Sequence, residues 1–266
     1  MTPAQADGVR TAAITVLVFL TLAPLTLTLP NDGLDPSWGL VIERAALQGW
    51  QWGRDIVFTF GPYGYHFQRI FHPDLAAEVL AGSAIRAALI GLGVALTLRG
   101  AGIWQSCAAL AAVALALPVA RDSAYFLLPF LVAVLHFTRP AKAPLWYLLL
   151  VAAYCGFAAL IKTTFAILGL VVLLIVDLDR LLDRRVPVFT PVCLAATLAA
   201  YIVAGQSFAS LPDFIALSLD VASGFSGAMS VFDWLRAVEL SAFIGASMVV
   251  LALILAEEKR RGRLGT

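Results

Sequence analysis

Charged residues are scarce in this chain, and their scarcity excludes most classes of soluble protein. Only 13% of its 266 residues are Asp, Glu, Lys or Arg, whereas 61% are hydrophobic. The mean hydropathy is +0.90. Soluble domains average about 25% charged and 45–50% apolar residues. The composition therefore excludes a soluble enzyme, a disordered chain and a disulfide-rich secreted module, and it indicates a membrane protein.

Cysteine and histidine are also rare, with three residues of each. Cys107, Cys155 and Cys193 all lie inside apolar runs, which is typical of small buried hydrophobes and not of a disulfide framework. His66 and His72 are six positions apart, which is not the spacing of a helical metal pair. The sequence indicates no cofactor, although a divalent metal stays open. With a net charge of +1 and no basic cluster beside stacking aromatics, no nucleic-acid partner is expected.

Uncharged runs of 16–20 residues recur along the chain and predict transmembrane helices. An α-helix rises about 1.5 Å per residue, so about 20 residues cross the hydrocarbon core. We expect an all-α, polytopic bundle of about eight spans forming a single transmembrane domain over 1–266, with six or seven spans as alternatives. The expected spans are 11–29, 79–97, 101–120, 123–138, 144–161, 163–176, 188–205 and 237–256.

The distribution of basic residues predicts the orientation of the chain. With a cytoplasmic N-terminus, eight spans leave 11 of the 18 Lys and Arg residues on the cytoplasmic side and six on the other. By the positive-inside rule, we expect an integral inner-membrane protein with both termini in the cytoplasm. No small-residue cleavage site follows the first run, so it is expected to be an uncleaved helix. The long loops 30–78 and 206–236 then face the exoplasm, and function is expected there.

The first long loop contains the signals of a helix lying in the membrane interface. Asp35 suits an N-cap, Pro36 suits the first helical position, and Gly49 suits a stop after Gln48. The residues expected on one face of this helix are Trp38, Val41, Ile42 and Ala45. Tryptophan is enriched at membrane interfaces, which supports this placement.

Two further segments of the exoplasmic loops show a local pattern. Ile56–Phe60 is a short apolar run between glycine-rich turns, and it is expected to be extended or to form a second interfacial helix. In the second loop, the amphipathic stretch Leu211–Val221 is expected to lead into a glycine-rich turn at Ser223–Ser230. That loop is predicted to act as a lid, a re-entrant segment or a simple connector.

The first loop resembles that of the GT-C type glycosyltransferases. The residues that carry the resemblance are Leu34-Asp35-Pro36-Ser37-Trp38, Gly53-Arg54-Asp55 and Phe58-Thr59-Phe60-Gly61-Pro62. The expected topology is also similar to that family. Uncharacterised bacterial membrane proteins share the first pattern. The resemblance implies transfer of a sugar from a polyprenyl phosphate to an acceptor on the exoplasmic face.

Three carboxylates are the candidate catalytic residues. The resemblance implies that Asp35 is the general base that deprotonates the acceptor. Asp55 is a second candidate in the same loop, and Asp122 is similar in location to a second acid of the family. Their structural alternatives are an N-cap for Asp35, a solvated turn for Asp55 and a charged hairpin for Asp122.

Basic and aromatic residues at the outer ends of the helices are candidate substrate ligands. An ammonium or guanidinium group suits a lipid phosphate. The candidates are Lys162, Arg54, Arg121 and Arg236, and Trp38 is a candidate for stacking on a sugar. Lys162 could instead snorkel to the interface. Arg86, about eight residues into the second span, is expected to need a carboxylate, a phosphate or water as its partner.

Two other functions stay open. A non-catalytic scaffold, or accessory subunit of a larger membrane complex, is favoured by the short chain and by Pro36, which stands where many GT-C enzymes have a second acid. A transporter is the lesser alternative. The expected partners are membrane lipid, a polyprenyl-phosphate sugar and, for the scaffold, another membrane protein. Convergence of Asp35, Asp55, Asp122 and Lys162 on one cavity would favour the enzyme.

Overall fold

The computed structural model shows an all-α protein and describes residues 3–23, 26–30, 33–119, 121–138 and 143–228, with Ser241 and Met248. This part of the chain contains ten α-helices and one short 3-10 helix at Phe208–Ser210. The α-helices are α1 (Pro3–Leu22), α2 (Leu34–Leu47), α3 (Tyr65–Gln68), α4 (Ala76–Thr97), α5 (Ile103–Val119), α6 (Arg121–Thr138), α7 (Leu145–Ala159), α8 (Thr163–Leu182), α9 (Phe189–Val203) and α10 (Leu211–Ala228).

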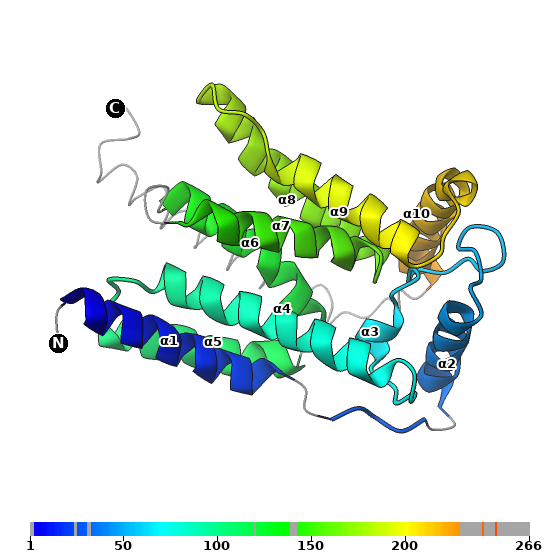
Figure 1. Ribbon diagram of the computed structural model, residues 1–266, viewed down its shortest axis with the longest axis horizontal. Coiled ribbons are helices and arrows are strands. Elements are labelled where there is room, and N and C mark those ends of the chain that lie inside the picture. The colour runs from blue at the N-terminus through cyan, green and yellow to red at the C-terminus, as the bar shows by residue number, and fades with distance from the viewer. Residues whose placement is uncertain are drawn as a thin grey trace. The chain divides into compact units, whose positions relative to one another are not determined.

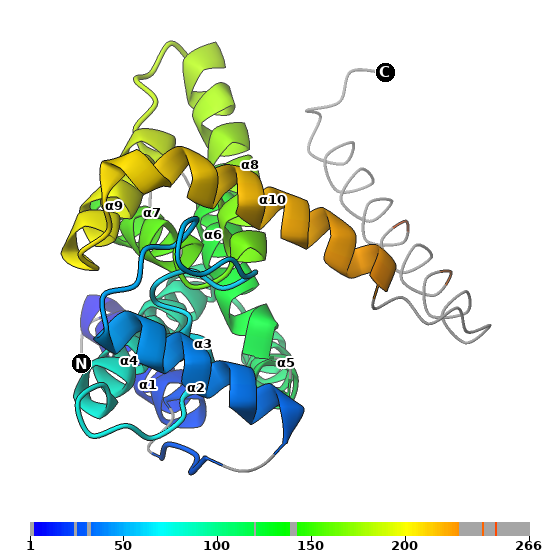
Figure 2. The same cartoon turned by 90° about the vertical axis from the view of Figure 1, so that its right-hand side faces the viewer.

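The chain divides into two compact units, Met1–Ala222 and Ser223–Thr266, and the packing described here is that of the first. In that unit α1 packs on α4, α6 on α8, and α7 on α9. These helices run alongside one another, whereas α2 lies across one end of the set, next to α3 (Figures 1 and 2). The first long loop of the sequence therefore covers the ends of α4 and α7.

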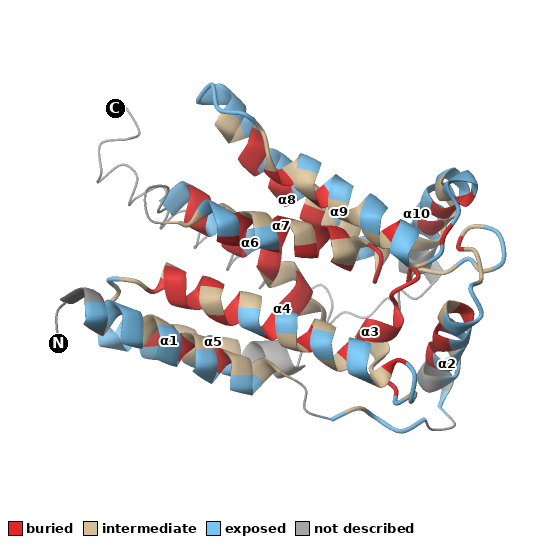
Figure 3. Ribbon diagram, viewed as in Figure 1, coloured by how far each residue is buried: buried red, intermediate tan, exposed pale blue. Residues whose placement is uncertain are grey.

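Burial follows the contacts between helices. Buried residues occupy the sides of α4, α6 and α7 that face their neighbours, and exposed positions follow α1, α5 and α8 (Figure 3). Many of the exposed residues are large and apolar, such as Trp104, Leu115 and Ile175. An apolar surface of this extent is unusual for a monomeric soluble protein.

The expected apolar segments are helical, but the expected count of eight spans is wrong for the residues that the structure describes. Seven of the eight segments overlap α1 and α4–α9, although the first, 11–29, is helical only to Leu22, and the eighth, 237–256, lies outside the described residues. Among those described, one helix, α4, is long and apolar enough to cross a membrane, and α9 with α10 would be a second if that pair, bent by 120°, forms one span.

The physical reason lies in helix length and charge. The helices α7 and α9 have 15 residues each, which is short of the roughly 20 needed to cross the hydrocarbon core. The helix α8 has 20 residues, but Asp177, Asp179 and Arg180 lie in its last third. Counting apolar runs in the sequence therefore gave too many full-length spans, because it ignored where each helix ends and where its charged residues lie.

The expected N-cap of α2 is also wrong. Gly33 is the N-cap, with extended backbone, and Asp35 is the second residue of the helix. The Ser37 amide donates to the Gly33 carbonyl at 3.2 Å, so the helix begins two residues earlier than expected. Pro36 is tolerated there because amides of the first turn have no intrahelical acceptor. The stop is confirmed, since Gly49 has φ +67° and Trp50 N–H bonds to Ala45.

The two loop segments resolve differently. Ile56–Phe60 is extended, with isolated bridges at both of its ends, so the first of its two alternatives is confirmed. The glycine-rich turn expected from Ser223 is wrong up to residue 228, because α10 continues as a helix to Ala228. An added Cβ at Gly224 would have nothing within 4 Å, so no close contact requires a glycine at this position.

Candidate functional site

The first long loop is tied to the break between α7 and α8. The Thr163 amide donates to the Thr59 carbonyl at 3.0 Å, and Phe60 and Lys162 form an antiparallel bridge. The Gly61 amide donates to the Ile161 carbonyl at 3.2 Å. A side chain at Gly61 would collide with the backbone of Leu160, so glycine is required for this close approach. The pairing fixes the loop beside Lys162.

Lys162 and Asp122 form an ion pair at this junction. Lys162 Nζ lies 2.8 Å from Asp122 Oδ2, which joins the N-cap of α8 to the first turn of α6. The second carboxylate oxygen, Oδ1, is buried and has no hydrogen-bond partner among the described residues. The ammonium also lies 4.9 Å from the ring centre of Phe67 and 5.6 Å from that of Phe165. Such cation–π contacts are favourable at desolvated sites.

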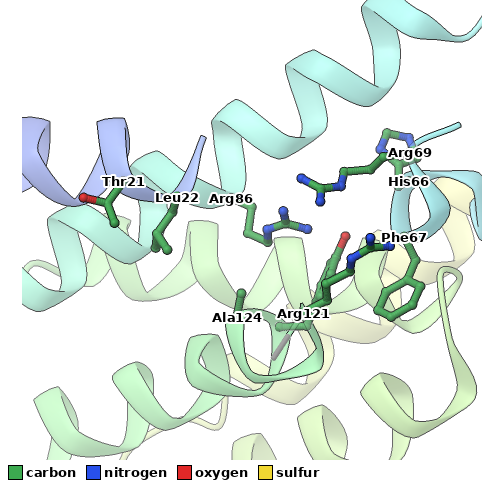
Figure 4. Close-up of a pocket in the computed structure, with 9 residues that line it drawn as sticks. Thr21, Leu22, His66, Phe67, Arg69, Arg86, Arg121 and Ala124 are labelled. Atoms are coloured by element: carbon green, nitrogen blue, oxygen red, sulfur yellow. The ribbon is translucent and has the colours of Figure 1, made fainter. Parts of the chain in front are cut away.

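Three arginines surround a cavity next to this ion pair, here called the arginine cavity (Figure 4). Its volume is about 140 Å³. Arg86 comes from α4, Arg121 begins α6, and Arg69 follows α3, so three elements meet here. The residues that line it are Thr21, Leu22, His66, Phe67, Arg69, Arg86, Arg121, Ala124 and Tyr125.

The three guanidinium groups of the arginine cavity have no counter-charge in the described chain. No carboxylate of those residues lies within 4 Å of them. Arg86 is only 8% exposed, and its guanidinium lies 4.4 Å from the centre of the Tyr125 ring. Burial lowers the pKa of Arg69, and the like charges of Arg121 and Arg86 lower it further. A cavity of this kind suits an anion, because arginine matches phosphate and carboxylate geometry.

Arg69 holds its place through an unusual backbone. It ends α3 in the left-handed region, with φ 55° and ψ 34°. Few non-glycine residues adopt this conformation, and those that do are often found at functional sites. The backbone amide of Arg69 donates to the Tyr65 carbonyl at 3.0 Å, which closes the short helix and directs the chain away from it.

An apolar groove adjoins the arginine cavity. It has a volume of about 240 Å³ and lies between α1 and α5. Thr21 lines both hollows, so they are neighbours at the end of α1. The other residues that line the groove are Leu17, Val18, Leu110, Ala111, Val113 and Ala114.

The structure brings only some of the expected site residues together. Asp122 and Lys162 are in contact, and Arg121 lines the adjacent arginine cavity. Trp38 lies 5.1 Å from the ring of Phe60, which in turn lies beside Lys162. Trp38 thus belongs to the aromatic surroundings of the ion pair.

The other expected residues are elsewhere or outside the description. Asp55 pairs with Arg54 at 3.0 Å and accepts the Gln51 amide at 2.9 Å, so both are part of an exposed turn. The bonds from Arg54 and Gln51 lower the pKa of Asp55. The side chain of Asp35 is not described, and Arg236 lies outside the described residues. The expected convergence of Asp55 with Asp122 and Lys162 is therefore not found.

Sequence reasoning missed Arg69 and gave Arg86 no role at a site. One signal for Arg86 was available, because Glu78, Gly82 and Arg86 are spaced at i, i+4 and i+8 and must share one face of a helix.

Comparisons with protein-family models, curated proteins and solved structures gave no match to this chain.

Proposed function

We propose that this chain is a membrane protein that binds a phosphate-bearing lipid, with the phosphate in the arginine cavity and the hydrocarbon chain in the apolar groove. The observation that carries the proposal is that the two hollows share Thr21 as a lining residue. Three guanidinium groups with no carboxylate partner in the described part of the chain suit a phosphate. A groove lined by Leu17, Val18 and Leu110 suits hydrocarbon.

The volumes support a ligand that is divided between the two sites. About 140 Å³ is below the 300–1,000 Å³ of typical small-molecule pockets, but it accommodates a small anion. A phosphate headgroup alone would leave the groove empty. The exposed apolar side chains of α5, α7 and α8 favour a bilayer around the bundle, so that more helices than α4 contact lipid.

The reaction proposed for this lipid is glycosyl transfer of the GT-C type. Its support is the resemblance of the first loop to that family, together with the three arginines of the arginine cavity, which suit a phosphate. A polyprenyl-phosphate sugar would bind with its phosphate near Arg69, Arg86 and Arg121. These arginines stabilise the negative charge of the departing phosphate. Asp35 is the proposed base for the acceptor hydroxyl.

The binding step is tested with a long-chain prenyl phosphate and the purified chain in nanodiscs. We expect Arg86→Gln to weaken its binding by at least tenfold, because one of three charge-assisted contacts is lost. Arg44→Gln, on the exposed face of α2, is the matched control and should bind normally. Equal affinity for the prenyl phosphate and for the matching uncharged prenol would refute the proposal.

The apolar groove is tested separately. Phenylalanine at Ala111 would fill the groove, so Ala111→Phe should weaken the prenyl phosphate and leave inorganic phosphate unaffected. Ala108→Phe, at an exposed position of the same helix outside the groove, is the control. Loss of both ligands in Ala111→Phe, or of neither, would show that the groove does not hold the chain.

The transfer step has its own test, a sugar-transfer assay with a radiolabelled polyprenyl-phosphate sugar. Asp35→Ala should abolish transfer and leave prenyl phosphate binding intact, since a base acts on the acceptor. Undiminished transfer by Asp35→Ala would overturn its role as the base.

A non-catalytic scaffold is the second candidate, and one observation favours it. Asp122 is engaged by Lys162, and Asp55 by Arg54, so neither is free to act as a base. On this alternative the lipid is a structural ligand. Prenyl phosphate binding without sugar transfer in the wild-type chain would support it.

A further inference from the structure

His66 and Glu78 form a pair at the edge of the arginine cavity. His66 Nε2 lies 3.2 Å from Glu78 Oε1, and the Tyr65 hydroxyl donates to the same oxygen at 2.8 Å. These contacts hold one oxygen of the carboxylate, and no described residue bonds to the other. The orientation of the imidazole is therefore set by a carboxylate, as in histidines that exchange protons.

The imidazole of His66 packs against Gly82 of α4. A Cβ added to Gly82 would lie 2.7 Å from Nδ1 and Cε1 of His66, so the ring occupies the space that only glycine leaves. Gly82 follows Glu78 by one turn and precedes Arg86 by one turn. The imidazole is thus located between the carboxylate and one arginine of the arginine cavity. The edge-on ring of Phe157, at 5.1 Å, packs against it.

The pair separates two hollows of different character. His66 lines the arginine cavity, whereas Glu78 lines a second hollow of about 310 Å³, here called the Glu78 cavity. His66 is 3% exposed and the Glu78 side chain is 50% exposed. Water therefore reaches the Glu78 carboxylate, which is bonded to the buried imidazole. The residues of the Glu78 cavity are Ala46, Trp52, Pro62, Tyr63, Tyr65, Leu75, Glu78, Val203, Ala204 and Gln206.

The imidazole is the group at the edge of the arginine cavity that can take up a proton. The ionisable groups around it are Glu78 on α4, Tyr63 and Tyr65 on the first loop and α3, Tyr154 on α7, which donates to the Gly82 carbonyl, and, in the same cavity, Tyr125 and the three arginines. Arginine and tyrosine keep their protons between about pH 5 and 8, and glutamate is ordinarily ionised. Histidine gains its positive charge in this range. Protonation therefore adds a fourth positive charge beside three guanidinium groups.

We propose that the arginine cavity binds its anion together with a proton that is held by His66 and Glu78. The inference rests on the proposed anion site. The proton comes from water and binds the ring nitrogen that carries no hydrogen, so the imidazolium still donates from Nε2 to Glu78 Oε1, and no other bond changes. An anion in the cavity offsets the repulsion between the imidazolium and the arginines, so each ligand strengthens the binding of the other.

Sulfate is a suitable probe, because its own charge stays constant across this range. We expect the full-length chain to bind sulfate about tenfold more tightly at about pH 5.5 than at about pH 7.5, as one added charge at a partly screened site predicts. Calorimetry near pH 6.5 in buffers of different ionisation enthalpy should show proton uptake on binding.

Two variants separate the imidazole from its surroundings. His66→Asn keeps a donor for Glu78 but takes up no proton, so its sulfate affinity should be independent of pH. Glu78→Gln removes the counter-charge, so the transition should move to lower pH. The controls are His72→Asn and Glu43→Gln, which lie outside both cavities and should retain the wild-type profile.

The outcomes distinguish this inference from the proposed function. Sulfate binding that is independent of pH in the wild type, or that keeps its pH dependence in His66→Asn, overturns the coupling and leaves the anion site standing. Absence of sulfate binding at every pH overturns both. A pH dependence that disappears in Glu43→Gln assigns the proton to Glu43 and refutes the role of His66.

Discussion

The ammonium of Lys162 lies 2.8 Å from the carboxylate of Asp122, although 40 positions separate the two residues. The pair links the start of α8 to the start of α6, and aromatic rings surround its positive end. Asp122 is the only acid in the first turn of α6, and it pairs with Lys162 and not with the neighbouring Arg121.

Breaking this pair should destabilise the protein. Lys162→Met leaves Asp122 without a partner, and Asp122→Asn does the same to Lys162. Both side chains are partly exposed, so water screens the remaining charge and each loss should be about 2 kcal/mol, below that of a fully buried pair. The measurement is urea unfolding in detergent. The double variant should lose less than the sum of the singles, and strictly additive losses would contradict the contact.

The stability of the fold should depend on pH through Glu43. Burial raises the pKa of this carboxyl from 4.5 to about 7, and its buried Oε2 has no hydrogen-bond partner among the described residues. The folded state then binds more protons than the unfolded state between these values, so stability should fall as pH rises from about 5 to 7, by about 2 kcal/mol. Glu43→Gln should remove the fall and exceed the wild type at pH 8. Equal pH profiles of the two proteins would refute the assignment.

Asp177 should be essential for the start of α9. Its carboxylate accepts the backbone amides of Val188 at 2.9 Å and of Thr190 at 2.6 Å, although it lies on α8. Asp177→Ala leaves these amides without an acceptor and should lower the free energy of unfolding by about 2–3 kcal/mol. Asp183→Ala, at the exposed end of α8, is the control and should change little. A small effect at Asp177 would mean that water replaces the carboxylate.

Two helical glycines should respond in opposite ways to alanine. A Cβ at Gly91 would lie 2.7 Å from the Thr15 carbonyl, where α4 packs on α1, whereas Gly8 has nothing within 4 Å. Gly91→Ala should destabilise the protein by about 1–3 kcal/mol through overpacking. Gly8→Ala should stabilise it by about 0.5–1 kcal/mol, because alanine is the better helix former. Thermal unfolding of the two variants checks both signs.

The helices could be predicted from sequence because their signals are local. Apolar runs bounded by Gly, Pro and charged residues coincide with α4–α9, and the glycine stop of α2 was read correctly. The start of α2 was misread because Gly33, Asp35 and Pro36 all suit a helix N-terminus. Which of them serves as the cap depends on how the preceding chain enters.

The site was less predictable because it depends on contacts between distant segments. Arg121 and Lys162 were expected at helix ends, and both lie at the start of a helix, but Arg69 reaches the arginine cavity only through the left-handed end of α3. The hydrophobic pattern of the sequence does not predict that turn. Asp55 shows the opposite error. The family-like pattern predicted a site residue, but its carboxylate pairs with the adjacent Arg54 in an exposed turn.

The bond from Thr163 to the Thr59 carbonyl spans 104 positions, and it has a consequence for how the chain is made. A ribosome that has released the segment around Thr59 must still synthesise the five helices α3–α7 before its partner emerges. During that interval the backbone groups of Thr59, Gly61 and Tyr63 lack these partners. Pairing of the first loop with the start of α8 is therefore a late event, completed only after α7 has been made.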